Sequence, residues 1–364
     1  MSNRVPRSVL GWDIGGANLK AARLVPGGPA TTLSVPFELW REPGALPQRL
    51  RAVAAQLGPA ECHAVTMTAE LADCFATKRE GVAAVLAAVE AAFPDALLAV
   101  WGADGAFHSP AAVCQAPLSV AAANWAATAT WIARTFPRAD RESAVLLVDV
   151  GSTTTDIVPI AGGAVRATGC TDPDRLLNGE LVYTGALRTN CVAIVRRVPL
   201  WGRECPVASE LFAVSGDVHV WLGHLDPAGY DVATPDGRST GREECGARLA
   251  RLVCADREML SAADLTAIAQ TIHLAQVRQI EQGLASVLAG QGWQEGDGHT
   301  KPLSDEVLAI TTGLGHFLAA EAAGRLGLTV VPLAEHVGAE ANRVTSALAV
   351  AALLMGIGDS PGVS

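Results

Sequence analysis

Short apolar runs alternate with amphipathic stretches through the first half of the chain. Runs rich in Val, Leu and Ala that end at polar or glycine residues predict strands at 10–13, 19–25, 32–38, 63–67 and 96–101. Apolar residues at three- and four-residue spacing predict helices at 47–57, 82–93 and 121–136. This alternation of strands and helices is typical of an α/β protein.

A polar stretch at 137–142 interrupts the pattern, which then restarts with a second hairpin of the same kind. Further strands are expected at 144–149, 156–160, 164–168 and 329–332, a strand that runs into a glycine turn at 307–315, and helices at 261–288, 317–326 and 344–357. The segment 229–246 is rich in Gly, Asp, Thr and Arg, which predicts a long surface loop or lid. Because one hairpin type opens both halves, we expect two domains, 1–140 and 141–364.

Two acid–glycine loops, within 10–20 and 146–156, carry the clearest chemical signal. Each apolar run reaches an aspartate, Asp13 or Asp149, and turns through glycine into a second strand. Successive backbone N–H groups in such turns form a concave anion site, so the pair predicts two related halves that bind one polyphosphate. The candidate phosphate-binding residues are Gly15, Gly16, Ala17, Asn18, Lys20, Gly151, Ser152, Thr153 and Thr154.

The aspartates of these loops cannot bind phosphate directly, so we expect them to hold Mg²⁺ through water. Asp13 and Asp149 are the main metal candidates, and Asp156 is a third. The alternative for Asp13 and Asp149 is that each only caps its turn. Near the end of the chain, Gly313 and Gly315 follow a strand and precede a helix, a position that accepts an anion or a ribose.

The amino-acid composition of the chain disfavours some classes of binding partner. The chain has 364 residues, half of them apolar, and a formal net charge of −10, which disfavours nucleic acid and anionic membranes as partners. The first eight residues lack the apolar core of a secretory signal, and 344–357 is too short to span a membrane. Eight cysteines without a CxxC pair predict reduced thiols and a cytoplasmic location, and disfavour a cysteine-built zinc site. The histidines show no triad pattern, and we expect ordinary roles for His108, His219 and His316.

Several stretches resemble a known family. The two aspartate–glycine hairpins, the later strand–glycine turn–helix and the apolar final helix resemble the actin/sugar kinase/Hsp70 superfamily. Residues 149–156 are similar to the second phosphate loop of the hydantoinase A/oxoprolinase family. Residues 11–21, 66–75 and 179–185 resemble the hydantoinase-like proteins of tetrahydromethanopterin-linked C1 metabolism. This resemblance implies two ribonuclease-H-like domains around a central cleft, with the last helix packing back near the domain interface.

The resemblance also implies a reaction. Archaeal members of this subgroup are synthases of methanofuran biosynthesis, so the implied pathway is methanofuran or methylofuran biosynthesis. They join an aminomethyl-furanylmethyl diphosphate to the phenol of γ-glutamyltyramine and release pyrophosphate. The implied partners are therefore a small-molecule diphosphate and a phenolic amine, with Mg²⁺ as cofactor, and a homodimer is left open.

The same resemblance singles out residues for substrate binding and proton transfer. Thr68, Glu70, Asp73 and Lys78 follow the strand 63–67, at the strand end where ligands gather in α/β folds. A phenol needs a base to become a good nucleophile, and Glu70 or Asp73 could accept its proton; the alternative is that both are first-turn acids of a helix. A glycine-framed polar segment adds three substrate candidates: Glu180, Tyr183 and Arg188.

Departures from the family leave two further functions open. The turn 312–316 has fewer glycines than the superfamily's adenosine-binding turn, which disfavours ATP without excluding it. The Thr-Asn pair of oxoprolinase-type enzymes is replaced by Thr68-Ala69-Glu70, and the partner subunit or domain of a full hydantoinase is missing. The alternatives are an ATP-dependent kinase or amidohydrolase, and a non-catalytic nucleotide-binding protein.

Overall fold

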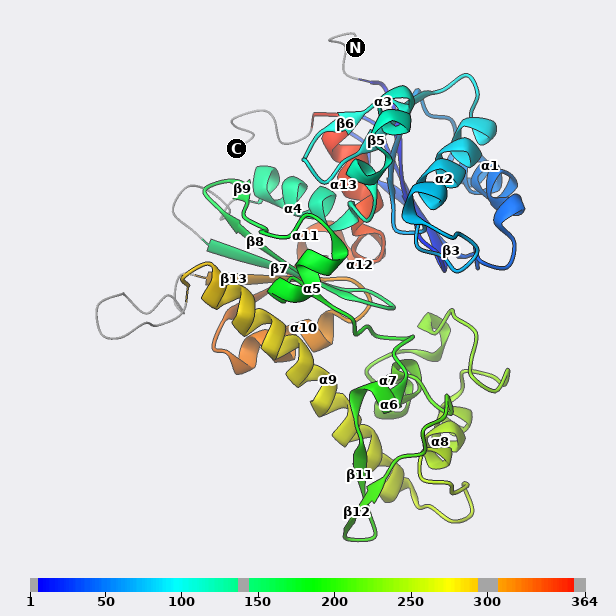
Figure 1. Cartoon of the computed structure of the whole chain (residues 1–364), viewed down its shortest axis with the longest axis vertical. Coiled ribbons are helices and arrows are strands. Elements are labelled where there is room, and N and C mark those ends of the chain that lie inside the picture. Colours follow the sequence, from blue (N-terminus) through cyan, green and yellow to red (C-terminus); the bar gives the residue numbers. More distant parts are fainter. Residues whose placement is uncertain (1–5, 137–143, 294–306, 357–364) are drawn as a thin grey trace. The chain divides into compact units, whose positions relative to one another are not determined.

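The computed structural model describes residues 6–136, 144–293 and 307–356 (Figure 1). The fold is mixed α/β, with two main sheets and helices packed against them. The described residues form two compact units. One takes its residues from 1–145, 158–172 and 333–364, and the other from 146–157 and 173–332. The compact units are not two consecutive stretches of the chain, because the described part of 333–364 belongs to the same unit as the N-terminal segment. The expected domains 1–140 and 141–364 therefore stay a prediction.

The first unit is built on a six-stranded sheet in the order β3-β2-β1-β4-β5-β6. Strands β1 and β2 form an antiparallel hairpin, and β4 runs parallel to both β1 and β5. The strands are β1 (Val9–Ile14), β2 (Asn18–Leu24), β3 (Thr31–Pro36), β4 (Cys62–Met67), β5 (Leu97–Trp101) and β6 (Phe107–His108). Because β1 and β4 are parallel neighbours, their carboxyl ends lie at the same edge of the sheet.

Helices cover both faces of this sheet. Leu10, Trp12 and Ile14 of β1 belong to one apolar cluster with α1 (Leu46–Leu57) and α2 (Lys78–Ala92), whereas Val9 belongs to a second cluster with α4 and α13. Alternate residues of a strand point to opposite faces, which explains this division. The helices on the second face are α4 (Asn124–Thr135) and α13 (Thr345–Leu354), and shorter helical segments lie at α3 (Pro110–Gln115), α11 (Ala334–Val337) and α12 (Ala339–Asn342).

Helix α13, the last helix of the described chain, packs against the first strand, β1. Figure 1 shows α13, in red, against the blue strands of the first unit. A Cβ atom at Gly11 would lie only 2.0 Å from the carbonyl oxygen of Ala347, so β1 needs glycine at this position. This contact places the first turn of α13 beside the middle of β1.

The second sheet has the order β10-β8-β7-β13-β14, with β9 paired to β8. Its strands are β7 (Ala144–Val150), β8 (Thr155–Ala161), β9 (Ala164–Val165), β10 (Leu181–Val182), β13 (Val307–Thr312) and β14 (Thr329–Pro332). Strands β13 and β14 are parallel and are connected through α10 (His316–Arg325). The 29-residue helix α9 (Ala262–Gly290) contacts α10.

A helical subdivision of the second unit surrounds the first half of α9. Its elements are α6 (Cys191–Ile194), α7 (Ser215–Leu222), α8 (Arg242–Arg251) and the hairpin of β11 (Arg197–Leu200) and β12 (Arg203–Pro206), whereas the glycine after α5 (Asp172–Asn178) packs against the second half of α9. The apolar residues of α6, α7, α8 and α9 share one core cluster. A fully buried ion pair joins Asp217 of α7 to Arg248 of α8, at 2.7 Å.

Most expected strands and long helices are confirmed, with differences at ends and in short elements. The helix expected from residue 121 begins at Asn124, and the segment expected as a loop over 229–246 contains the start of α8 at Arg242. The single helix α9 fills the segment where one or two were expected. The polar stretch 137–142 and residue 357 of the expected last helix lie outside the described residues.

Candidate functional site

The first glycine loop, residues 15–17 between β1 and β2 (loop 1), is a tight turn that tolerates little side-chain volume. The backbone N–H of Gly15 donates to the carbonyl of Asn18, at 3.0 Å. A Cβ atom at Gly15 would lie 2.9 Å from that carbonyl oxygen and 3.5 Å from Oγ1 of Thr68. The close approach explains the glycine and places loop 1 beside the residues that follow β4.

Asp13 is buried near the end of β1. One of its carboxylate oxygens accepts a hydrogen bond, and the other has no hydrogen-bond partner. Its Oδ2 accepts a hydrogen bond of 2.5 Å from the Ser346 hydroxyl and lies 3.5 Å from Nζ of Lys20. Its Oδ1 and the Oδ1 of Asn18 are buried without a hydrogen-bond partner. Buried oxygens without a partner are costly, and carboxylate and amide oxygens are hard donors of the kind Mg²⁺ prefers. The donor set around Asp13 therefore fits Mg²⁺.

The loop after β4, residues 68–77, packs directly against loop 1. The N–H of Thr68 donates to the carbonyl of Ile14, at 2.9 Å, and a Cβ atom at Gly16 would touch the side chain of Ala72. Glu70 lies within this loop and is 1% exposed. A candidate base and a candidate phosphate loop are thus neighbours in the first unit.

The Glu70 carboxylate has the electrostatics of a proton acceptor near neutral pH. Burial raises the pKa of Glu70 to about 7, the nearby charge of Asp172 adds to the rise, and Lys78 opposes it. The Nζ of Lys78 lies 3.8 Å from Oε1 of Glu70 and forms a closer ion pair with Asp172. Oε2 of Glu70 is buried without a hydrogen-bond partner. Lys78 therefore divides its charge between two carboxylates, and Glu70 is left able to take up a proton.

The other residues expected in this region have different surroundings. Asp73 and Thr68 are exposed, and neither Glu70 nor Asp73 is in a helix, since α2 begins at Lys78 with Thr77 as its N-cap. The alternative interpretation, that Glu70 and Asp73 are first-turn acids of a helix, is therefore wrong. The reason is local, because the Thr77 hydroxyl accepts from the backbone N–H of Glu80 and so sets the start of the helix later.

The second glycine loop, residues 151–154 between β7 and β8 (loop 2), repeats the turn of loop 1 in the second unit. The N–H of Gly151 donates to the carbonyl of Thr154, at 2.9 Å. The carbonyl of Ser152 accepts from the N–H groups of Leu187 and Arg188, at 3.0 and 2.9 Å. A Cβ atom at Gly185 would lie 2.5 Å from the backbone of Thr153. The segment 184–188 therefore holds loop 2 in place.

The late glycine turn packs on the end of β7. A Cβ atom at Gly313 would lie 2.3 Å from Oδ1 of Asp149, and the φ of Gly313 is +84°. The N–H of Gly315 donates to the carbonyl of Val150, at 2.8 Å, and a Cβ atom there would lie 2.4 Å from the Val150 side chain. Packing against the end of β7 thus explains both glycines, and Asp149 is half-buried beside them.

The remaining predicted site residues of the second unit differ in exposure. Asp156 accepts a hydrogen bond of 2.7 Å from Arg175, an ion pair that favours a structural role over metal binding. Glu180 is buried, and its carbonyl accepts from Ile157 and Arg175. Tyr183 and Arg188 are exposed; Tyr183 directly precedes the segment that holds loop 2, and Arg188 is the last residue of that segment.

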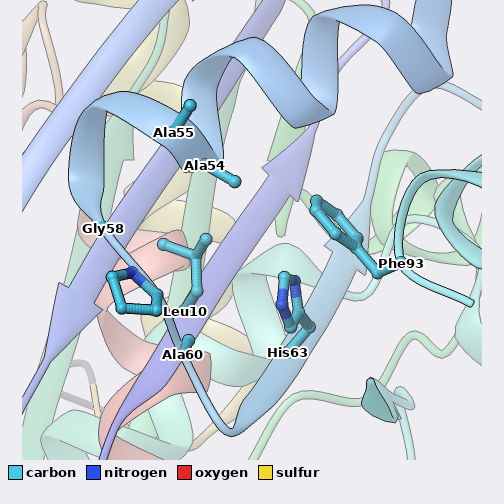
Figure 2. A pocket seen from close by; sticks show the side chains of 8 residues that line it. Leu10, Ala54, Ala55, Gly58, Ala60, His63 and Phe93 are labelled. Atoms are coloured by element: carbon cyan, nitrogen blue, oxygen red, sulfur yellow. The ribbon is translucent and has the colours of Figure 1, made fainter. Parts of the chain in front are cut away.

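A separate surface cavity of about 340 Å³ lies in the first unit (Figure 2). It is lined by Leu10, Ala54, Ala55, Gly58, Pro59, Ala60, His63 and Phe93. Figure 2 shows the His63 ring facing Phe93, and the indole N–H of Trp12 donates to Nδ1 of His63, at 3.1 Å. Burial lowers the pKa of His63 to about 4, so this histidine is neutral at pH 7. The lining contains none of the predicted site residues.

Two contacts of the site were not predicted from the sequence. Asp172 pairs with Lys78 and Ser346 with Asp13, across 94 and 333 positions of the chain. Neither residue stands in a recognisable pattern, so only their tertiary placement reveals them. The cysteines are all free, and no helix in the described part of the chain combines the length and apolar character needed to cross a membrane.

The fold, with its two glycine loops, is of the actin/sugar kinase/Hsp70 type. The solved nucleotide-free structure of an acetone carboxylase shares this fold, with a TM-score of 0.57 at 12% identity, over 95% of this chain and 70% of that one. The family model of hydantoinase/oxoprolinase matches residues 61–354. The chain belongs to this hydantoinase/oxoprolinase family and is an enzyme.

Two curated relatives share one name, (4-{4-[2-(γ-L-glutamylamino)ethyl]phenoxymethyl}furan-2-yl)methanamine synthase. The one from Methanocaldococcus jannaschii is 33% identical over 95% of this chain and 97% of its own length. The one from Methanococcus vannielii is 29% identical over 57% of this chain and 90% of its own length.

Proposed function

We propose that this enzyme forms an aryl ether between a phenol and a furanylmethyl group, as the name of its relatives describes. That name specifies a phenoxymethyl link between a glutamylaminoethyl-substituted phenol and a furan that carries a methanamine group. The substrates we assign are γ-glutamyltyramine and the furanylmethyl diphosphate, and the second product is pyrophosphate. The proposal places the enzyme in methanofuran-type cofactor biosynthesis.

The reaction breaks one carbon–oxygen bond and forms another. The bond between the furanylmethyl carbon and the diphosphate breaks, and its electron pair leaves with pyrophosphate. The phenol oxygen bonds to that carbon, and its proton passes to a base. Each developing charge needs a partner in the site: an anion-binding site for the diphosphate and a proton acceptor for the phenol.

The observation that best supports this proposal is the buried Glu70 carboxylate with its raised pKa. A phenol with a pKa near 10 is a poor nucleophile at neutral pH until its proton is removed. A carboxylate with a pKa of about 7 is a much stronger base than an ordinary one, and its bare Oε2 can accept the proton. The Lys78 ammonium lies 3.8 Å from Oε1 of Glu70 and is shared with Asp172, so it stabilises the Glu70 carboxylate only in part and leaves its pKa raised.

The glycine loops supply the anion-binding function. In loop 1 the backbone turn and the Lys20 ammonium provide positive charge near Asp13, and in loop 2 the Ser152, Thr153 and Thr154 hydroxyls are half-buried. Asp13 in the first unit and Asp149 in the second are each our candidates to hold Mg²⁺, which would supply charge neutralisation for the leaving pyrophosphate. Thr68, Tyr183 and Arg188 are our proposed contacts to the organic parts of the substrates.

The test is a product assay with both substrates and Mg²⁺. The full-length protein should release pyrophosphate only when the phenolic amine is present, and mass spectrometry should find the ether. Transfer of the γ-phosphoryl group of ATP to a small molecule, or ATP hydrolysis coupled to amide cleavage, with no ether formed, would replace this proposal by the kinase or amidohydrolase alternative. Since Gly313 and Gly315 are accounted for by packing on Asp149 and Val150, the geometry of this turn does not favour ATP.

A further inference from the structure

Three histidines come together in the second unit, away from the residues assigned above. His219 lies on α7, His224 follows the glycine that ends α7, and His273 lies on α9. One nitrogen from each ring lies within 4.8 Å of those of the other two. The turn after α7 makes this possible, because the backbone N–H of His224 donates to the carbonyl of His219, at 2.9 Å.

One ring nitrogen of His219 forms a hydrogen bond, and the other has no hydrogen-bond partner. The side-chain NH₂ of Gln276 donates to Oγ1 of Thr184 and to the carbonyl of Gly185, at 2.9 and 2.8 Å. Its amide oxygen must therefore accept, and it lies 2.9 Å from Nε2 of His219. This bond places a proton on Nε2, so Nδ1 of the fully buried ring carries a lone pair, and it has no hydrogen-bond partner.

His273 is oriented in the same way. Its Nε2 lies 2.7 Å from Oε2 of Glu321, and the other oxygen of Glu321 accepts from Arg325, at 2.8 Å. Its Nδ1 is buried and has no hydrogen-bond partner. A carboxylate or amide oxygen on the far nitrogen of a histidine is the usual outer partner of a metal-binding imidazole, because it fixes the tautomer and the ring orientation.

We propose that His219, His224 and His273 form a site for a divalent transition-metal ion of the Zn²⁺ class, with the fourth position open to water or an anion. Neutral imidazole nitrogens suit Zn²⁺ and its neighbours far better than Mg²⁺, which prefers oxygen. Zn–N bonds are about 2.0–2.1 Å, so two nitrogens bound to one ion lie at most roughly 4 Å apart. The exposed His224 side chain closes the remaining distance by rotation.

The surroundings of the cluster agree with this assignment. The ring of Phe317 lies 4.9 Å from that of His219 and 5.2 Å from that of His224, and so forms an apolar wall. The exposed position of His224 gives an ion a path from solvent and leaves room for a fourth ligand. The ion would join α7 to α9, and through Gln276 it would support the segment that holds loop 2.

Cobalt binding to the full-length protein tests the proposal independently of catalysis. After treatment with a chelator, the protein should bind one Co²⁺ per chain, with the visible absorption of tetrahedral cobalt, and Zn²⁺ should displace it. His224→Ala alters an exposed side chain and should weaken binding at least tenfold with no change in circular dichroism. Glu321→Gln keeps the three ligands and should weaken binding about ten- to a hundredfold.

His108→Ala is the matched control, since His108 contacts Asp104 in the first unit and should leave the affinity unchanged. No Co²⁺ binding by the wild type, or the same binding by His224→Ala, would overturn the proposal. A thiolate-to-cobalt charge-transfer band would also overturn it, because it would assign the ion to cysteines.

Discussion

The hydroxyl of Ser346 donates a 2.5 Å hydrogen bond to Oδ2 of Asp13, although 333 positions separate the two residues. The contact forms because α13 packs on β1 where Gly11 leaves room for the helix backbone. It fixes the rotation of the Asp13 carboxylate and leaves Oδ1 as the oxygen without a partner. The last helix of the described chain thus orients the first acid of the site.

Loss of charge at either strand-end aspartate should abolish most of the activity. Asp13→Asn and Asp149→Asn keep the side-chain shape but remove the negative charge that would hold Mg²⁺. We expect turnover to fall at least about a hundredfold, near 2.7 kcal/mol of barrier, with Tm little changed. Steady-state rates measure the effect, and Asp104→Asn, at an exposed aspartate, is the control. Wild-type rates in Asp13→Asn and in Asp149→Asn would show that the two aspartates only cap their turns.

Replacement of the proposed base should change the pH–rate profile. In the wild type, kcat/KM should rise with pH through about 7 as Glu70 loses its proton. Glu70→Gln should remove this limb and lower the rate by roughly 10²–10⁴-fold, while diphosphate binding persists. The exposed Glu90→Gln on α2 serves as the control. Asp73→Asn is measured in parallel, and loss of the limb there instead would make Asp73 the base.

The same carboxylate should make the free energy of unfolding depend on pH. The pKa of Glu70 is about 7 in the folded state against an ordinary value of 4.5, so folding favours its protonated form. This contribution is fully present below pH 4.5 and is lost as pH rises through 7. Urea unfolding at pH 5 and pH 8 should show a smaller loss of stability with pH for Glu70→Gln than for the wild type. Equal losses would contradict the raised pKa.

The glycine beside Asp149 should be irreplaceable. Gly313→Ala combines a positive φ with a Cβ atom 2.3 Å from the Asp149 carboxylate, so we expect a loss of about 1–3 kcal/mol in unfolding free energy and a lower rate. Gly324→Ala on α10 is the matched control. Its Cβ atom would meet nothing within 4 Å, and alanine should stabilise the helix by roughly 0.5–1 kcal/mol. Urea titration measures both, and an unchanged Gly313→Ala would refute the packing argument.

Pyrophosphate with Mg²⁺ should stabilise the protein more than ATP does. A ligand that binds only the folded state adds about 2.7 kcal/mol at a hundredfold excess over its Kd. A thermal shift assay with each ligand measures this, and the shift with pyrophosphate should shrink in Asp13→Asn. A shift with ATP and none with pyrophosphate would favour the nucleotide-dependent alternatives.

The pattern of apolar and polar residues along the chain was sufficient to predict those elements whose geometry is set by residues adjacent in the sequence. Both hairpins, their glycine turns and the strand β14 follow from apolar runs that end at Asp and Gly, because turn geometry is set within a few residues. The helix α2 was predicted from residue 82 and begins at Lys78, because the Thr77 hydroxyl caps it before the apolar spacing starts. Short helices such as α11 and α12 were missed because four residues carry no period.

The sequence by itself determined the fold class, the two glycine loops and the family, since these depend on periodicity and on residues that are adjacent in the chain. Only the tertiary structure decided how the acids are used. It buried Glu70 near Lys78 and Asp172, and it paired Asp156 with Arg175. It also gathered three histidines whose positions in the chain show no pattern. Burial and partner charges set the chemistry of an ionisable group, and both arise from contacts between residues far apart in the chain.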